Sequence, residues 1–89
     1  MASPLLFVSN EARILDRIRK GDEEALVELY RANRKAITAL VTRNSGTTDD
    51  ADDMLQEALV TLWERVRSGA FEQTAQLGTF LYATAKNLW

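Results

Sequence analysis

The chain has 89 residues, enough for one small domain with a single hydrophobic core. It contains neither cysteine nor histidine, which excludes disulfides, thiolate metal sites and the commonest general base, so we expect a non-enzymatic protein without a metal or cofactor. The formal net charge of −2 disfavours indiscriminate binding to nucleic acid.

The N-terminal stretch, residues 1–9, has a short apolar patch with no basic segment before it. It fits neither a signal peptide nor a membrane span, so we expect a flexible segment and a cytoplasmic protein without membrane insertion. The first helix is predicted over residues 10–20 and ends before Gly21. Its inner face has three apolar residues, Ile14, Leu15 and Ile18.

The second helix is predicted to begin after Asp22, whose carboxylate is suited to cap the free N–H groups of a first turn. Glu23 and Glu24 follow and complement the helix dipole. Apolar residues then recur at helical spacing and predict a buried stripe, interrupted at Asn33. The stripe consists of Leu26, Leu29, Tyr30, Ile37, Leu40 and Val41, and it leaves Arg31, Arg34 and Lys35 outside.

The third helix is predicted to begin at Thr47 or Thr48 and to end near Ser68, with Gly69 just beyond. Thr47 and Asp50 have the spacing of a capping box. At 100° per residue one side of this helix is apolar and must be buried; it carries Leu55, Ala58, Leu59, Leu62 and Val66. The opposite side, within about 60° of Asp53, carries Gln56, Glu57, Val60 and Glu64.

This second side has two interpretations. It is either a solvated face with one stray valine or a docking surface, in which Val60 supplies apolar contact and the acids select a basic partner. Charge is unevenly distributed, because residues 47–69 carry six acids against two bases while residues 1–46 carry eight bases against six acids. The aspartates at 49–53 lack the spacing of a calcium loop, and helix-dipole matching explains them better.

Residues 69–77 are predicted to form a loop, and a fourth helix is predicted to open between residues 74 and 78 and to run to the end. Its inner face is expected to hold Leu77, Phe80, Leu81, Thr84 and Leu88, with Phe80 buried. A separate face holds Tyr82, Lys86 and Trp89. No stop signal follows, which predicts a longer natural protein. Because no strand pattern occurs, the fold class is all-α, a small bundle of about four helices.

Three ordered motifs resemble region 2 of the extracytoplasmic-function sigma factors of bacterial RNA polymerase. The first is GDEEALVELYRANRKAI, from residue 21. The second is DADDMLQEALVTLWERV, with the Asp53-Met54-Leu55-Gln56-Glu57 core and the Leu62-Trp63 pair. The third is LGTFLYATAKNLW, with Phe80-Leu81-Tyr82 and Ala85-Lys86-Asn87. They cover most of residues 20–89, so residues 1–89 are interpreted as one sigma region 2 domain, without the family's C-terminal helix-turn-helix domain.

The resemblance implies two partners. The acidic-amide face would bind the coiled coil of the β′ subunit of core polymerase through Asp53, Gln56, Glu57, Val60 and, nearer the rim, Glu64. The loop and the fourth helix would recognise the promoter −10 element and hold it open by capturing bases of the non-template strand. The candidate DNA-binding residues are Phe71, Thr74, Tyr82, Lys86, Asn87 and Trp89. An anti-sigma factor is a further candidate partner.

The sequence supplies some of the groups that binding to melted DNA requires, but few cations. Capture of an unstacked base needs aromatic platforms, hydrogen-bonding groups such as Asn87, and cations such as Lys86 for the phosphates. Residues 70–89 contain only Glu72 and Lys86 as charged residues, so we expect weak DNA affinity from this chain alone. The alternative function is a helical protein-interaction module with a sigma-like fold and no role on DNA.

Overall fold

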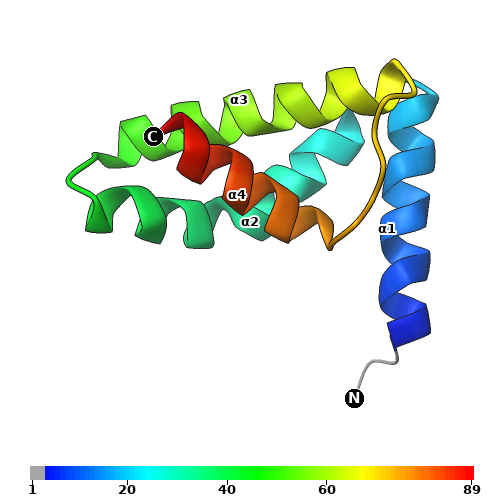
Figure 1. Ribbon diagram of the computed structural model, residues 1–89, viewed down its shortest axis with the longest axis horizontal. Coiled ribbons are helices and arrows are strands. Elements are labelled where there is room, and N and C mark those ends of the chain that lie inside the picture. Colours follow the sequence, from blue (N-terminus) through cyan, green and yellow to red (C-terminus); the bar gives the residue numbers. More distant parts are fainter. Residues whose placement is uncertain (1–3) are drawn as a thin grey trace.

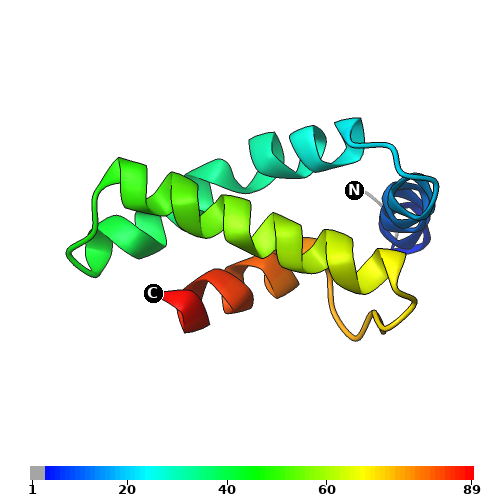
Figure 2. The same ribbon diagram turned by 90° about the horizontal axis from the view of Figure 1, so that it is seen from above.

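A computed structural model describes the backbone of residues 4–89 and the side chains from Asn10 onward. It has four helices: α1 (Pro4–Arg19), α2 (Glu24–Arg43), α3 (Thr48–Arg67) and α4 (Leu77–Leu88). No strand occurs within residues 4–89, so the predicted all-α class with about four helices is confirmed. Helices α2 and α3 run antiparallel side by side, α4 packs against both, and α1 lies across one end of this group (Figure 1, Figure 2).

The first helix begins at Pro4, earlier than the start predicted near Asn10. Proline suits the first helical position because its missing N–H would have no partner there, and no glycine interrupts the chain between it and Arg19. Residues 4–9 of the segment expected to be flexible therefore belong to α1, while residues 1–3 lie outside the described residues. The helix ends as predicted before Gly21, which has a positive φ of 80°.

Side chains near the starts of α2 and α3 bond the backbone there. The N-cap position of α2 is Glu23, one residue later than the predicted Asp22, and the Glu23 side chain makes no capping bond. An Asp22 carboxylate oxygen accepts a hydrogen bond from the Glu24 N–H at 3.0 Å. At α3 both bonds of the predicted capping box are present. The Thr47 hydroxyl accepts from the Asp50 N–H at 3.0 Å, and the Asp50 carboxylate accepts from the Thr47 N–H at 2.9 Å. The capping box fixes where α3 begins.

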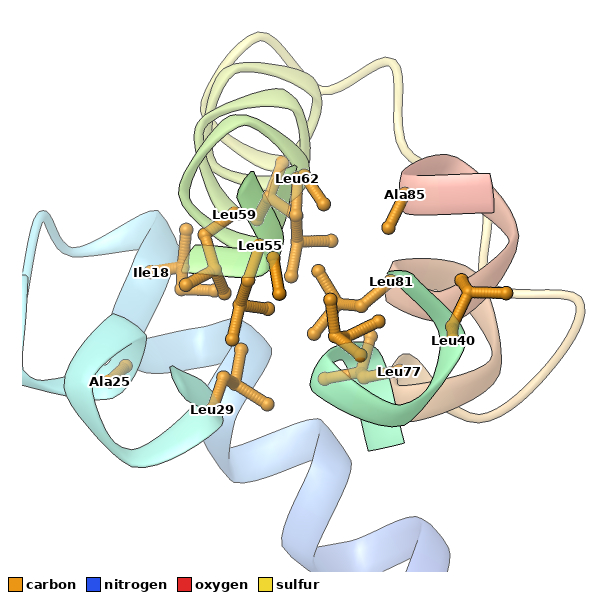
Figure 3. Packing of buried hydrophobic residues seen from close by; sticks show 14 of the residues in the cluster. Ile18, Ala25, Leu29, Leu40, Leu55, Leu59, Leu62, Leu77, Leu81 and Ala85 are labelled. Atoms are coloured by element: carbon orange, nitrogen blue, oxygen red, sulfur yellow. The ribbon is translucent and has the colours of Figure 1, made fainter. Parts of the chain in front are cut away.

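The core lies where α2, α3 and α4 meet, and α3 runs through its centre (Figure 3). All five apolar residues predicted for the inner side of α3 are buried, and Ala51 joins them. Leu55 and Leu62 of α3 face Leu77 and Leu81 of α4 across this core. The remaining buried residues among the described side chains are Leu15, Ile18, Ala25, Leu29, Ile37, Leu40, Val41 and Ala85.

Six residues assigned to inner faces are not fully buried. The half-buried ones are Ile14, Leu26, Tyr30, Phe80 and Thr84, and the exposed one is Leu88. Leu88 is 45% exposed, since it lies at the last position of α4, beyond the helices that would cover it. Phe80 is half-buried rather than buried, because it packs at the edge of the core against Phe71. Ala85 takes the central place instead, so the buried line of α4 runs through Leu77, Leu81 and Ala85.

Packing and polar contacts attach α1 to the rest of the domain. Ile18 and Leu15 are buried in the common core. Arg17 pairs with Asp22 at 2.8 Å and with Glu28 of α2 at 2.7 Å. The hydrogen bond from Arg17 holds the pKa of the Asp22 carboxyl below its usual value. No helix formed by residues 4–89 is both long and apolar enough to cross a membrane.

Candidate functional site

The outward side of α3 carries the five residues predicted to contact polymerase, here called the docking face. The apolar side of the helix is committed to the core, so these residues point away from it. All five are exposed, and Val60 is 52% exposed between carboxylates. The docking face consists of Asp53, Gln56, Glu57, Val60 and Glu64. All of them except Glu64 line an open depression together with the half-buried Met54 and Thr61.

A short hydrogen-bonded chain connects this face to α2. The Gln56 amide donates to one carboxylate oxygen of Asp52 at 2.6 Å. The Tyr30 hydroxyl of α2 donates to the other oxygen, and this bond raises the pKa of the Tyr30 phenol above its usual value. Asp52 therefore has both oxygens occupied, and it orients Gln56 along the docking face. Tyr30 and Asp52 could not be predicted as members of this site, because their pairing depends on how α2 and α3 pack.

Two acids in the first turns of α3 are held by neighbouring groups. No group of three or more acidic, histidine or cysteine side chains capable of holding a metal ion occurs among the described residues. Asp50 is engaged in the capping box and Asp52 in the chain with Tyr30 and Gln56. The acids at the start of α3 thus serve the helix end and the neighbouring side chains.

At the other end of α3, the loop 68–76 and the outer side of α4 enclose a pocket of about 200 Å³. The rings of Phe71 and Phe80 meet edge to face, with centroids 5.3 Å apart, and form its aromatic wall. The Arg65 guanidinium lies 5.8 Å from the centre of the Phe80 ring. The remaining lining residues are Glu72, Thr74, Ala75, Thr79 and Ala83.

Two of the six predicted DNA-binding residues, Phe71 and Thr74, meet at this pocket. Thr79 and Ala83 also line the pocket and were not among the predicted site residues. Their i, i+4 spacing on α4 was a usable signal, but small residues on an outer face draw no attention until a loop is seen to cover them. Phe80 was assigned only to the core, although one side of its ring also borders the pocket.

The other four predicted DNA-binding residues lie farther along α4. Lys86 and Asn87 are exposed in its last turn. Tyr82 is half-buried, and its hydroxyl accepts from Arg43 of α2 at 3.4 Å. Trp89 is 46% exposed and donates from its indole nitrogen to the Asn44 carbonyl oxygen at 3.1 Å. The structure therefore divides the predicted set between the pocket and the opposite end of α4.

Trp89 closes onto the turn between α2 and α3 because Gly46 leaves room for its ring. A Cβ atom at Gly46 would lie 2.7 Å from the indole and 2.3 Å from the buried Val41 side chain. Only glycine fits this contact, so the placement of Trp89 depends on the turn as well as on α4.

Comparison with known families assigns the architecture. The family model for sigma-70 region 2 matches residues 29–89, from the second turn of α2 to the end of the chain. The chain belongs to the sigma-70 region 2 family. The match includes the docking face and the pocket, and α1 lies before it.

One curated relative of this sigma region 2 chain is the ECF RNA polymerase sigma factor SigW of Bacillus subtilis (strain 168). The two are 28% identical over 74 residues, which cover 83% of this chain and 38% of SigW. The chain thus spans well under half the length of that relative. The search of solved structures found none that matches.

Proposed function

We propose that this sigma region 2 domain binds core RNA polymerase through the docking face and binds melted −10 promoter DNA through the pocket and α4. The domain is non-enzymatic, and the polymerase supplies the nucleotide chemistry. The relative SigW is an RNA polymerase sigma factor, and the family match includes both surfaces. These partners place the protein in the bacterial cytoplasm.

Polymerase binding is supported chiefly by the exposure of Val60 and Gln56 amid carboxylates on the rigid α3. A small apolar centre surrounded by acids suits a coiled coil that offers arginines and apolar side chains, as the β′ coiled coil would. Charged contacts of this kind give specificity and a fast approach, and the valine supplies contact that excludes water.

A binding assay with the β′ coiled-coil fragment tests this contact. Val60→Glu, alone or combined with Gln56→Ala, should weaken binding by about tenfold or more, because it places a charge at the apolar centre. Val27→Glu is the matched control, since Val27 is a 38% exposed valine on α2, outside the docking face. Equal binding by the two valine variants, or no binding by the wild type, would leave the alternative of a protein-interaction module with another partner.

The pocket is suited to a single extruded base. Phe71 and Phe80 supply an apolar wall, while Thr74, Thr79 and Glu72 supply hydroxyl and carboxylate groups that recognise base edges. Lys86 and Asn87 lie farther along α4, where the next nucleotides of the strand would pass. Tyr82 and Trp89 offer partly exposed rings beside them.

Filling the pocket tests base capture. Ala83→Phe should lower affinity for single-stranded oligonucleotides that carry a randomised −10 element by about tenfold, the order of one stacked base. Ala36→Phe places the same side chain on an exposed position of α2 and should leave affinity unchanged. Binding should also weaken with rising salt and after Lys86→Glu, but not after Lys35→Glu. Equal affinity for all these proteins would remove the pocket from the DNA-binding surface.

A further inference from the structure

The start of α4 has no cap of its own. Gln76 occupies the N-cap position, and its side chain makes no capping hydrogen bond. The first N–H groups of a helix need acceptors, and leaving them unpaired in a part-buried place costs free energy. The Leu77 side chain is fully buried, so solvent has limited access to this turn.

A residue from α1 supplies the missing acceptor. One carboxylate oxygen of Glu11 accepts from the Leu77 N–H at 2.9 Å, across 66 positions of sequence. The negative charge also lies at the positive end of the α4 dipole. The other oxygen accepts from the Gln73 side-chain amide at 2.6 Å. Glu11 therefore joins the loop and the first turn of α4 to α1 with a single side chain.

The first turn of α4 is also held from its other side. A Cβ atom at Gly78 would lie 2.9 Å from the Asn33 amide oxygen of α2, so α4 approaches α2 closely there. The loop that follows α3 runs beside α1 before it reaches this turn (Figure 1). Between the end of α3 and Leu77, Gln73 is the loop residue whose side chain is tied to another helix by a hydrogen bond.

We propose that Glu11 is a positioning residue for base capture: it fixes the loop conformation in which Phe71, Thr74 and the α4 residues enclose the pocket. This inference rests on the proposed DNA function. The two hydrogen bonds from Gln73 and Leu77 to Glu11 are here called the clamp. Gln73 lies between Phe71 and Thr74 in sequence, so a shift of the clamp displaces the pocket wall. Through this clamp α1, which lies outside the family match, contributes to DNA binding without touching DNA.

Four variants test the clamp: Glu11→Ala, Glu11→Gln, Gln73→Glu and the double exchange of Glu11→Gln with Gln73→Glu. Glu11→Ala removes both acceptors, and Gln73→Glu sets two carboxylates against each other. Glu11→Gln keeps an acceptor for Leu77. In the double exchange the new amide at position 11 donates to the new carboxylate at position 73, so the clamp is rebuilt with its charge moved.

Two readouts are needed, hydrogen exchange at the Leu77 amide and affinity for single-stranded −10 oligonucleotides. Glu11→Ala and Gln73→Glu should each raise exchange and weaken oligonucleotide binding by about fivefold, the size of a lost cap. Glu11→Gln and the double exchange should stay near wild type in both. Binding to the β′ coiled coil should be the same for all.

The outcomes separate the two proposals. If the wild type binds oligonucleotides and the variants bind equally well despite faster exchange at Leu77, Glu11 is only a structural cap and the inference is overturned. If the double exchange fails to restore the oligonucleotide affinity that Gln73→Glu loses, the proposed role of the clamp is also overturned. If the wild type itself does not bind oligonucleotides, the proposed base capture is wrong, and the role proposed for Glu11 is wrong as well.

Discussion

Asp52 connects the packing of α2 on α3 with the docking face, because its two oxygens accept from Tyr30 and from Gln56. The neutral phenol is the form that donates, so the pKa of Tyr30 is raised in the folded protein. The stability that this bond contributes is fully present below the usual tyrosine pKa. It is lost as the pH rises through the higher folded value.

An alkaline titration measures this effect. The chain has two tyrosines, so Tyr82→Phe leaves Tyr30 as the remaining phenol. Its ionisation, followed by the ultraviolet absorbance of the phenolate, should have a midpoint above the usual value of 10.0. Adding Asp52→Ala should bring the midpoint down towards that value. A midpoint that does not respond to Asp52→Ala would contradict the pairing.

Single residues on α3 were predictable from the sequence because helical geometry alone decides their side. The exposure of Gln56 and Val60 and the burial of Leu55 and Leu62 follow from the 100° spacing. Contacts between distant residues were not predictable in this way. The Glu11 cap of Leu77 joins positions that only the packed helices bring together.

At the scale of helices, the capping box of α3 gives a direct stability prediction. Thr47→Ala should lower the free energy of unfolding by about 1 kcal/mol, because the Asp50 N–H loses its acceptor. For a domain of this size that corresponds to a fall of roughly 4–8 °C in Tm. Thermal unfolding followed by circular dichroism measures it.

Thr48→Ala is the matched control for Thr47→Ala. Thr48 is the first residue of α3, and within the described residues its side chain makes no hydrogen bond. The control should therefore change Tm little. If both threonine variants lose the same stability, the loss comes from helix propensity and the capping box is unimportant.

Helix ends were predictable where a local signal marks them and were missed where it does not. The Thr47 and Asp50 pair and the glycines after α1 and α3 mark their boundaries directly. The start of α1 was placed too late, because a single proline before an apolar run gives a weaker signal than a polar cap. Leu88 was wrongly placed on the buried face of α4, because the last turn of this helix extends beyond the core and leaves the side chain exposed.

For the whole molecule, Ile18 decides whether α1 folds with the bundle. Its side chain is fully buried, so Ile18→Ala should cost about 2–5 kcal/mol of unfolding free energy. Ile14→Ala, at a half-buried position of the same helix, should cost less. Denaturant unfolding should remain a single transition for both variants. Two separate transitions in the wild type would mean that α1 is not part of the cooperative unit.

The overall architecture was readable from the sequence because a chain with long helical intervals and one apolar stripe per helix has few ways to bury those stripes. The number and order of the helices followed from it, whereas the central place of α3 became clear only from the packed structure. The pocket did not, because it forms between a loop and the outer side of α4, where the small residues Thr79 and Ala83 give no hydrophobic pattern.

The docking face and the pocket share no residue and lie on different parts of the domain. If both proposed contacts form, a polymerase that already holds α3 presents the pocket to nearby promoter DNA at a high effective concentration. Weak intrinsic affinity for single strands is then sufficient on the assembled enzyme. The same weakness keeps the free domain from occupying DNA on its own, so polymerase capture and promoter engagement become linked events.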